Sequence, residues 1–168
     1  MSEEIRSETP VIADSGERRE FVSGAVRDMS EGKGRCDLLP LDVAAGCLDE
    51  RAVLSIIADF MEMQDENILQ YALQAFRTER GWDAATMILE VAVHAENGAK
   101  KYGERNWEKG IPTHSYVDSA VRHYLKWKRG DEDERHDRAF CWNVLALMWT
   151  MKHKAEYNDL PQMEGDGK

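Results

Sequence analysis

Histidines and carboxylates that could bind a divalent cation recur at helical spacing in the second half of this 168-residue sequence. On helical wheels, several polar side chains fall on or beside apolar stripes that would face a core. They are Glu96, His123, Asp133, His136, Asp137 and Asn143. A buried carboxylate is costly unless it pairs, loses its charge or binds a metal. Carboxylates and imidazoles on facing helices build the metal sites of helical bundles, so this set predicts a Mg²⁺ or Mn²⁺ site.

The same residues also have purely structural interpretations. His123 alone could be a hydrogen-bonded core histidine. His136 and Asp137 could form the ordinary first turn of a helix, where acids favour the helix dipole, with Asp133 as its cap. The convergence of the whole set from three predicted helices favours the metal site.

A basic stretch of the chain suits phosphate. Residues 100–129 contain eight Lys or Arg and three acids, whereas residues 41–99 contain eleven acids and three bases. Carboxylates that hold a cation beside Lys and Arg are typical of sites for phosphorylated ligands. The alternative is that these charges are solvated helix faces, with Asp118 and Arg122 as a surface ion pair.

Composition limits the possible classes of protein. The net charge of −10 argues against a binder of polymeric nucleic acid, which needs surplus Lys and Arg. No apolar stretch approaches the length of a membrane span, and the N-terminus has no signal-peptide pattern. The cysteines at 36, 47 and 141 form no CxxC pair, which predicts a reduced protein of the cytoplasm, or of the host cytoplasm if a phage encodes it.

The pattern of apolar residues predicts an all-α helical bundle. Helices are expected near 41–47, 49–62, 65–79, 83–102, 115–129 and 134–154, with a loop over 103–112. Asp49, Asp65 and Asp83 stand where N-caps would be. A single domain over 21–157, opening with an irregular Gly-rich segment at 21–40, follows a disordered arm (1–20) and precedes a flexible tail (158–168).

The orientation of the predicted helix 83–102 decides which of its polar residues reach the core. One face combines Ala85, Ile88, Leu89, Ala92, Ala95, Ala99 and Tyr102, with Glu96 at its edge. Glu90, His94 and Lys101 fall on the opposite face. The wheel therefore predicts that Ile88 and Leu89 are buried and that His94 is not.

Three stretches resemble a known family: SGAVRDMSEGKGRCDLLPLDV, HAENGAKKYGERNWEKGIP and DSAVRHYLKWKRGDEDERHDRAFCWN. They are similar to phage and bacterial dATP/dGTP diphosphohydrolase domains, which are related in style to the all-α, MazG-like nucleoside triphosphate pyrophosphohydrolases. The similarity spans about 21–159. It implies a MazG-like bundle, a homodimer or homotetramer, and Mg²⁺-dependent cleavage between the α- and β-phosphates of a purine deoxynucleotide.

The resemblance also suggests roles for residues. Its RH element matches Arg122 and His123, its D-x-x-H element matches Asp133 and His136, and its GKGR element contains Lys33 and Arg35. The first-helix acidic cluster corresponds by position to Glu90, His94 and Glu96. The usual ExxE and ExxD spacing of MazG-like enzymes is absent, since Glu90 and Glu96 are six residues apart.

The leading hypothesis is therefore hydrolysis of dGTP or dATP to the monophosphate and pyrophosphate with Mg²⁺ or Mn²⁺. The expected metal ligands are Glu90, His94, Glu96, His123, Asp133, His136 and Asp137, of which Glu96, Asp133 and Asp137 are the candidate catalytic carboxylates. The expected substrate-binding residues are Lys33, Arg35, Lys100, Lys101, Arg105, Asn106, Arg122, Lys126 and Asn143, with Arg27 also closing over the phosphates.

Two other functions fit parts of the sequence. The irregular ligand spacing motivates a non-catalytic, sponge-like nucleotide-binding protein of phage type. The adjacent His136 and Asp137, with His94 upstream, suggest an HD-type triphosphohydrolase, but the chain is short for that fold. The reaction products separate these hypotheses.

Overall fold

The computed structural model describes residues 16–48 and 52–162. In this part of the chain the protein is predominantly helical, with one small β-ribbon, which confirms the predicted all-α class. The helices are α1 (Leu41–Ala45), α2 (Ala52–Met63), α3 (Leu69–Arg80), α4 (Ala84–Tyr102), α5 (Thr113–Arg129) and α6 (His136–His153). The strands are β1 (Arg18–Glu20) and β2 (Val26–Asp28).

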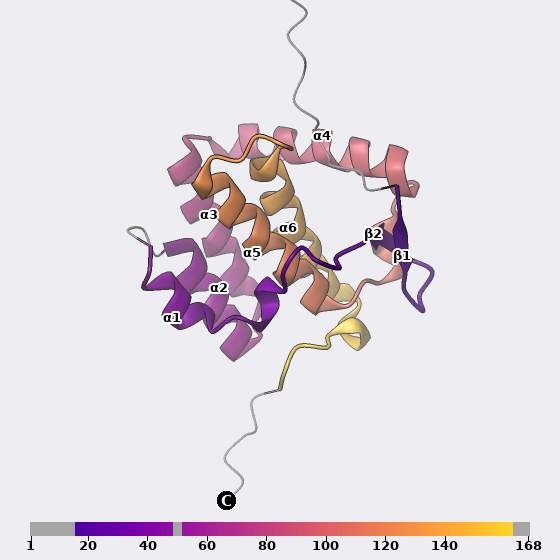
Figure 1. The fold of residues 1–168 in the computed structure, drawn as a ribbon, viewed down its shortest axis with the longest axis horizontal. Coiled ribbons are helices and arrows are strands. Elements are labelled where there is room, and N and C mark those ends of the chain that lie inside the picture. Colours follow the sequence, from indigo (N-terminus) through magenta and orange to yellow (C-terminus); the bar gives the residue numbers. More distant parts are fainter. Residues whose placement is uncertain (1–15, 49–51, 163–168) are drawn as a thin grey trace, which may run out of the picture.

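Helix α5 lies in the middle of the molecule and packs along α6, to which the turn 130–135 connects it (Figure 1). Helices α1, α2 and α3 form one side, and α4 crosses the bundle above α6, as Figure 1 shows. The ribbon lies beyond the C-terminal end of α4, far from α1 and α2. This arrangement leaves the ribbon, α4, α5 and α6 around a common space.

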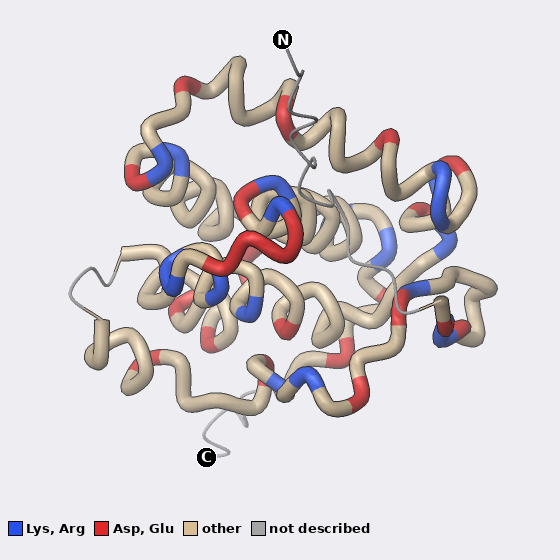
Figure 2. Tube along the Cα trace, turned by 45° about the horizontal axis from the view of Figure 1, so that its top comes forward, with Lys and Arg blue, Asp and Glu red and all other residues tan. Residues whose placement is uncertain are grey.

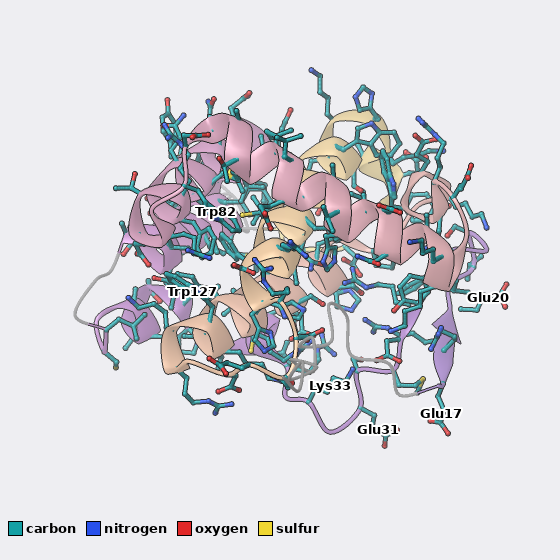
Figure 3. All side chains as sticks on the ribbon, turned by 90° about the horizontal axis from the view of Figure 1, so that it is seen from above. Glu17, Glu20, Glu31, Lys33, Trp82 and Trp127 are labelled. Carbon is teal, nitrogen blue, oxygen red and sulfur yellow. The ribbon has the colours of Figure 1, made fainter. Side chains whose placement is uncertain are left out.

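An aromatic cluster joins α3, α5 and α6 at the other side of the bundle. The ring of Phe76 lies 4.6 Å from that of Phe140 and 6.2 Å from that of Tyr124, measured between centroids. Trp82 and Trp127 pack edge-on against Phe76 at 6.3 and 4.9 Å, and Figure 3 shows both on this side of the molecule. Burying each of these large side chains stabilises the fold by roughly 1.5–3 kcal/mol.

The predicted helix starts are confirmed in part. Asp83 caps α4 by accepting a hydrogen bond from the backbone N–H of Thr86 at 2.7 Å. Asp65 caps a 3₁₀ turn (Glu66–Ile68) that leads into α3, rather than α3 itself. Asp49 lies outside the described residues. Helix α5 begins at Thr113, two residues earlier than expected.

The N-terminal arm is more ordered than the sequence suggested. Residues 18–20, expected to be disordered, form β1, which pairs with β2 in the antiparallel register Arg18↔Asp28, Arg19↔Arg27 and Glu20↔Val26. Local composition missed this strand because it is only 3 residues long and because Asn106, which holds its partner β2, lies 80 residues further along the chain. Residues 1–15 are outside the described part.

Side chains of three residues of the bundle and its loop bond to the backbone of the N-terminal segment 16–40, called the arm from here on. Asn106 bonds to both the N–H and the C=O of Val26, each at 2.9 Å. The Asp118 carboxylate accepts from the N–H of Cys36 at 2.6 Å, and Arg122 donates to the Gly34 carbonyl at 2.6 Å. These bonds satisfy backbone groups of the irregular segment that no helix or strand would satisfy.

The C-terminal segment also departs from the prediction. Residues 158–162, expected to belong to a flexible tail, pack on the bundle, and Leu160 is buried. Asp159 accepts from the backbone N–H of His114 at 2.9 Å, at the start of α5. Residues 163–168 are outside the described part. No described helix has the length and apolarity needed to cross a bilayer.

The three cysteines are free thiols, as the absence of a CxxC pair suggested. The predicted burial of Ile88 and Leu89 is wrong, since 51% and 68% of these residues is exposed. Helix α4 instead turns Met87, Val91 and His94 toward α6. Self-association of the chain stays a prediction.

Gly110 offers a test of the loop before α5. Its φ is +111°, and a Cβ added there would overlap the ring of Tyr157. We expect Gly110→Ala to lower the free energy of unfolding by about 1–3 kcal/mol in urea titrations. The control is Gly98→Ala in α4, where an added Cβ meets nothing within 4 Å and about 0.5–1 kcal/mol of stabilisation is expected. Equal effects of the two substitutions on the free energy of unfolding would contradict the close packing of Gly110 against Tyr157.

Candidate active site

The space between the arm, α4, α5 and α6 is a cavity of about 300 Å³. Near the end of α4, the cavity wall consists of aromatic and small residues, namely Ala95, Gly98, Tyr102 and Trp107. It is rich in ionisable groups where α5 meets the turn before α6. The cavity therefore has an apolar part and a polar part, as sites for small organic ions commonly do.

Two histidines face each other at the polar end. His123 of α5 and His136 of α6 have their Nδ1 atoms 2.9 Å apart. The Glu134 carboxylate lies 3.5 Å from Nδ1 of His123 and 3.6 Å from Nδ1 of His136. One donor atom from each of the three residues lies within 4.8 Å of the others, which is the spacing of ligands around one metal ion.

Asp133 fixes the orientation of the buried His136 ring. Its Oδ1 is 2.6 Å from Nε2 of His136, whose side chain is only 1% exposed. A carboxylate on Nε2 favours a proton there and leaves the Nδ1 lone pair directed at His123 and Glu134. Asp131 and Asp133 form a second acidic group on the same histidine.

Burial keeps His94 and His123 neutral. Desolvation, reinforced by the charge of His136, lowers the pKa of His123 well below its ordinary value. Desolvation lowers the pKa of His94 to about 4, with Arg27 contributing. Neutral imidazole is the form that binds a metal ion. Burial alone would raise the pKa of Asp133, but its hydrogen bond to His136 and the nearby charges of His136 and Lys126 together outweigh this, and the pKa is lowered.

Six cations line the cavity against three acids. The cations are Arg19, Arg27, Lys33, Arg105, Arg122 and Lys126, and the acids are Asp28, Asp133 and Glu134. This surplus contrasts with the net charge of −10 of the whole chain. Figure 2 shows the acidic turn after α5 close to blue segments of the neighbouring helices. The local balance suits an anion that brings a metal with it.

Part of the predicted substrate-binding set lines this cavity. Its members there are Lys33, Arg105, Asn106, Arg122, Lys126 and Asn143. Arg122 is committed to a bidentate bond with the buried Asp118, at 2.9 and 2.8 Å, and the pair is therefore not a surface one. Asn106 is likewise occupied by the arm backbone.

Three predicted substrate-binding residues are not among the residues that line the cavity. Arg35 is exposed and pairs with Asp37 at 2.6 Å. Lys100 forms an exposed i,i+4 pair with Glu96 at 3.0 Å. Lys101 lies over the ring of Tyr102. Spacing along α4 placed Lys100 and Lys101 near the basic loop, but the rotation of the helix directs them elsewhere.

Three predicted metal ligands also lie apart from the histidine pair. Glu96 is a surface residue, 65% of whose side chain is exposed. Glu90 and Asp137 belong to an ion-pair network with arginines of α3, the turn and α6, in which Arg80 and Arg135 contact Asp137 at 3.1 and 3.0 Å. Asp137 and His136 are adjacent in sequence but bond to different partners, an arrangement that does not favour an HD-type metal pair.

Two features of the site were missed from the sequence. Glu134 was counted only as part of an acidic run, because the wheel had begun the helix there and helix α6 in fact begins at His136. Arg19 was assigned to the disordered arm. A helical wheel that begins at His136 leaves Glu134 outside the helix. The segments RRE and VRD are too short for β-propensity alone to predict that they pair.

The fold and this site define an all-α protein with a cation-lined cavity that ends in a histidine–carboxylate group. The chain belongs to the family described as dATP/dGTP diphosphohydrolase, N-terminal, whose model matches residues 64–160, more than half of the chain. The resemblance inferred from the sequence is thereby confirmed. No curated protein and no solved structure matches the chain.

The buried His94 makes a prediction for acid stability. Its pKa is about 4 in the folded protein against 6.5 for an ordinary histidine, so the unfolded chain binds the proton first. This contribution to stability is complete above pH 6.5 and is lost as the pH falls toward 4. The free energy of unfolding should decrease between pH 7 and 4, and we expect this decrease to be smaller in His94→Leu by up to about 3 kcal/mol.

Urea titrations at several pH values measure this difference. His153 is exposed and supplies the control, so His153→Gln should leave the pH profile unchanged. The residual slope of the His94 variant is expected to come from His123, whose pKa is lowered in the same direction. An unchanged profile in His94→Leu would contradict a neutral, buried His94.

Proposed function

We propose that this protein hydrolyses dGTP or dATP to the deoxynucleoside monophosphate and pyrophosphate, with Mg²⁺ or Mn²⁺. The family description supports a diphosphohydrolase. The observation that carries the proposal is the juxtaposition of the histidine pair His123–His136 and Glu134 with a cavity whose charge is locally positive.

The residues present fit a divalent ion. His123, Glu134 and His136 offer two nitrogens and one carboxylate oxygen within ligand spacing, and Asp133 supports His136 from behind. Two imidazoles beside a carboxylate favour Mn²⁺ over Mg²⁺, which prefers oxygen ligands. When bound there, such an ion supplies neutralisation of phosphate charge and polarisation of the reacting centre.

The chain's own groups account for the remaining steps. Water forms a bond to the α-phosphorus, the bond from that phosphorus to the α–β bridging oxygen breaks, and pyrophosphate leaves. Asp133 accepts the proton of the water, because its lowered pKa keeps it ionised and its side chain is 52% exposed. Lys126, 3.4 Å from Asp133, lies where it can contact the phosphates.

The apolar part of the cavity suits the purine. Tyr102, Trp107 and Trp142 line it, and the rings of Trp107 and Trp142 are held edge-on at 5.8 Å. Aromatic walls of this kind contact a base through its face and edges. The nucleotide would then lie with its base toward the end of α4 and its phosphates toward the histidines.

Products and variants test the reaction. Protein with dGTP and Mn²⁺ should yield dGMP and pyrophosphate, separated by ion-exchange chromatography. We expect Glu134→Gln and His136→Gln to lose about 100-fold or more in kcat/KM, because each removes a ligand, and Asp133→Asn about 10–100-fold. Glu96→Gln, on the surface, should stay within about twofold of the unsubstituted protein.

The outcomes separate the hypotheses. dGTP bound tightly but recovered intact would replace the enzyme by the sponge-like binding protein. Tripolyphosphate as the product would restore the HD-type alternative. Loss of activity in Glu96→Gln together with full activity in Glu134→Gln would overturn the assigned site.

Metal binding can be measured without turnover. Chelator should abolish hydrolysis, and added Mn²⁺ should restore it. In calorimetric titrations with Mn²⁺, His123→Gln should weaken binding by about tenfold or more, whereas Glu90→Gln, whose carboxylate is held by arginines, should keep the original affinity. Equal weakening by both substitutions would contradict the histidine-based site.

A further inference from the structure

Two arginines stand directly opposite each other in the β-ribbon. In the antiparallel register, Arg19 of β1 pairs with Arg27 of β2. Directly opposed residues of such a pair project from the same face and lie close together, and like charges in these positions destabilise the pairing. Both arginines line the cavity. The ribbon therefore holds two positive charges side by side, and their repulsion makes the pairing of β1 with β2 less favourable.

Neither arginine has a carboxylate partner among residues 16–48 and 52–162. Arg27 donates to the Ser119 hydroxyl at 3.1 Å and to the Asn143 side-chain oxygen at 2.8 Å, both neutral acceptors. Arg19 lies over the ring of Phe21, and its Nε is buried without a hydrogen-bond partner. A buried guanidinium nitrogen without an acceptor is unfavourable, so its persistence calls for an explanation.

The other cations of the cavity differ in this respect. Lys33 contacts Asp28 at 2.9 Å, and Lys126 contacts Asp133 at 3.4 Å. Arg122 is held by Asp118, and Arg105 by Glu108. The pairing of these four cations leaves Arg19 and Arg27 as the charges that an incoming anion would meet uncompensated.

The glutamates of the arm do not neutralise Arg19 and Arg27. Glu17, Glu20 and Glu31 are exposed and lie at the periphery of the molecule, as Figure 3 shows. Desolvation and the charge of Arg27 lower the pKa of Arg19, and desolvation lowers that of Arg27. Arginine nevertheless keeps its charge in proteins, so both charges persist in a partly buried setting.

The position of the pair relates it to the histidines. Ser119, which accepts from Arg27, precedes His123 by four residues on α5, about 6 Å along the helix axis. Arg27 therefore contacts α5 about one helical turn from His123, and Arg19 lies opposite Arg27 in the ribbon. A chain of linked phosphates could contact both groups at once.

We propose that Arg19 and Arg27 form a clamp for the β- and γ-phosphates, the part of the substrate that leaves as pyrophosphate. This inference rests on the proposed function and extends it: the arm, which lies outside the matched residues 64–160, selects a polyphosphate over the monophosphate product. Guanidinium groups suit this task because their N–H groups bind phosphate oxygens in pairs.

The test measures binding of inorganic pyrophosphate to the full chain, with chelator present and no metal added. Calorimetry should show saturable binding to the unsubstituted protein and a loss of about tenfold or more in Arg19→Gln and in Arg27→Gln. Arg18→Gln is the matched control, because it removes the same charge from the same strand, where Arg18 has Asp28 as a partner. It should bind pyrophosphate as the unsubstituted protein does.

Thermal unfolding separates a clamp from a structural role. Without ligand, Arg19→Gln should melt at the same temperature as the unsubstituted protein or higher, because the like-charge pair is gone. Added pyrophosphate should raise the melting temperature of the unsubstituted protein but not that of Arg19→Gln. In hydrolysis with Mn²⁺, the same substitution should raise KM for dGTP more than it lowers kcat, and should change inhibition by dGMP little.

Pyrophosphate that binds equally to Arg19→Gln and the unsubstituted protein, or to neither, would overturn the clamp. A lower melting temperature of unliganded Arg19→Gln would also do so, since it would show a structural role. Arginine-dependent pyrophosphate binding in a protein that never cleaves dGTP would leave the clamp standing and reject the hydrolase. Hydrolysis of dGTP with unchanged kinetics in Arg19→Gln and in Arg27→Gln would reject the clamp and leave the hydrolase standing.

Discussion

The buried bidentate pair of Asp118 and Arg122 is the interaction on which the cavity depends. The carboxylate accepts from Arg122 and from the Cys36 backbone, and the guanidinium donates to the Gly34 carbonyl. One ion pair thus joins α5 to a segment with no regular structure of its own. Its desolvation is offset because every bond is charge-assisted and the partners are close. This pair fixes residues 34–36 of the arm against α5, beside the cavity wall that Arg27 and Lys33 form.

The histidine site shows how an acidic protein can prepare a place for an anion. Burial keeps His123 and His94 neutral, and Asp133 holds the His136 ring in one orientation. The excess of acids over the whole chain lies mainly outside the cavity, where water screens it. Inside, cations of the arm and of α5 outnumber the carboxylates. Net charge therefore says little about which ligand this site accepts.

The arm and the helical core have different roles in this arrangement. The core supplies His123, Glu134 and His136, all within the part of the chain that the family model matches. The arm supplies Arg19, Arg27 and Lys33, and its placement depends on core residues such as Asn106. A division of this kind allows the ligand preference to change through the arm while the proposed metal ligands stay with the core.

The sequence by itself determined the helical class, the family and the pairing of His123 with Asp133 and His136, because these follow from local periodicity and from residues close together in the chain. It grouped Glu96, Glu90 and Asp137 with the histidines, from which the structure separates them, and it did not single out Glu134 and Arg19. Those outcomes depended on the rotation of α4, on where α6 begins and on a strand pairing. Packing against α6 sets the rotation of α4, and Asn106, 80 residues further along the chain, holds β2 in place; only the tertiary structure contains these contacts.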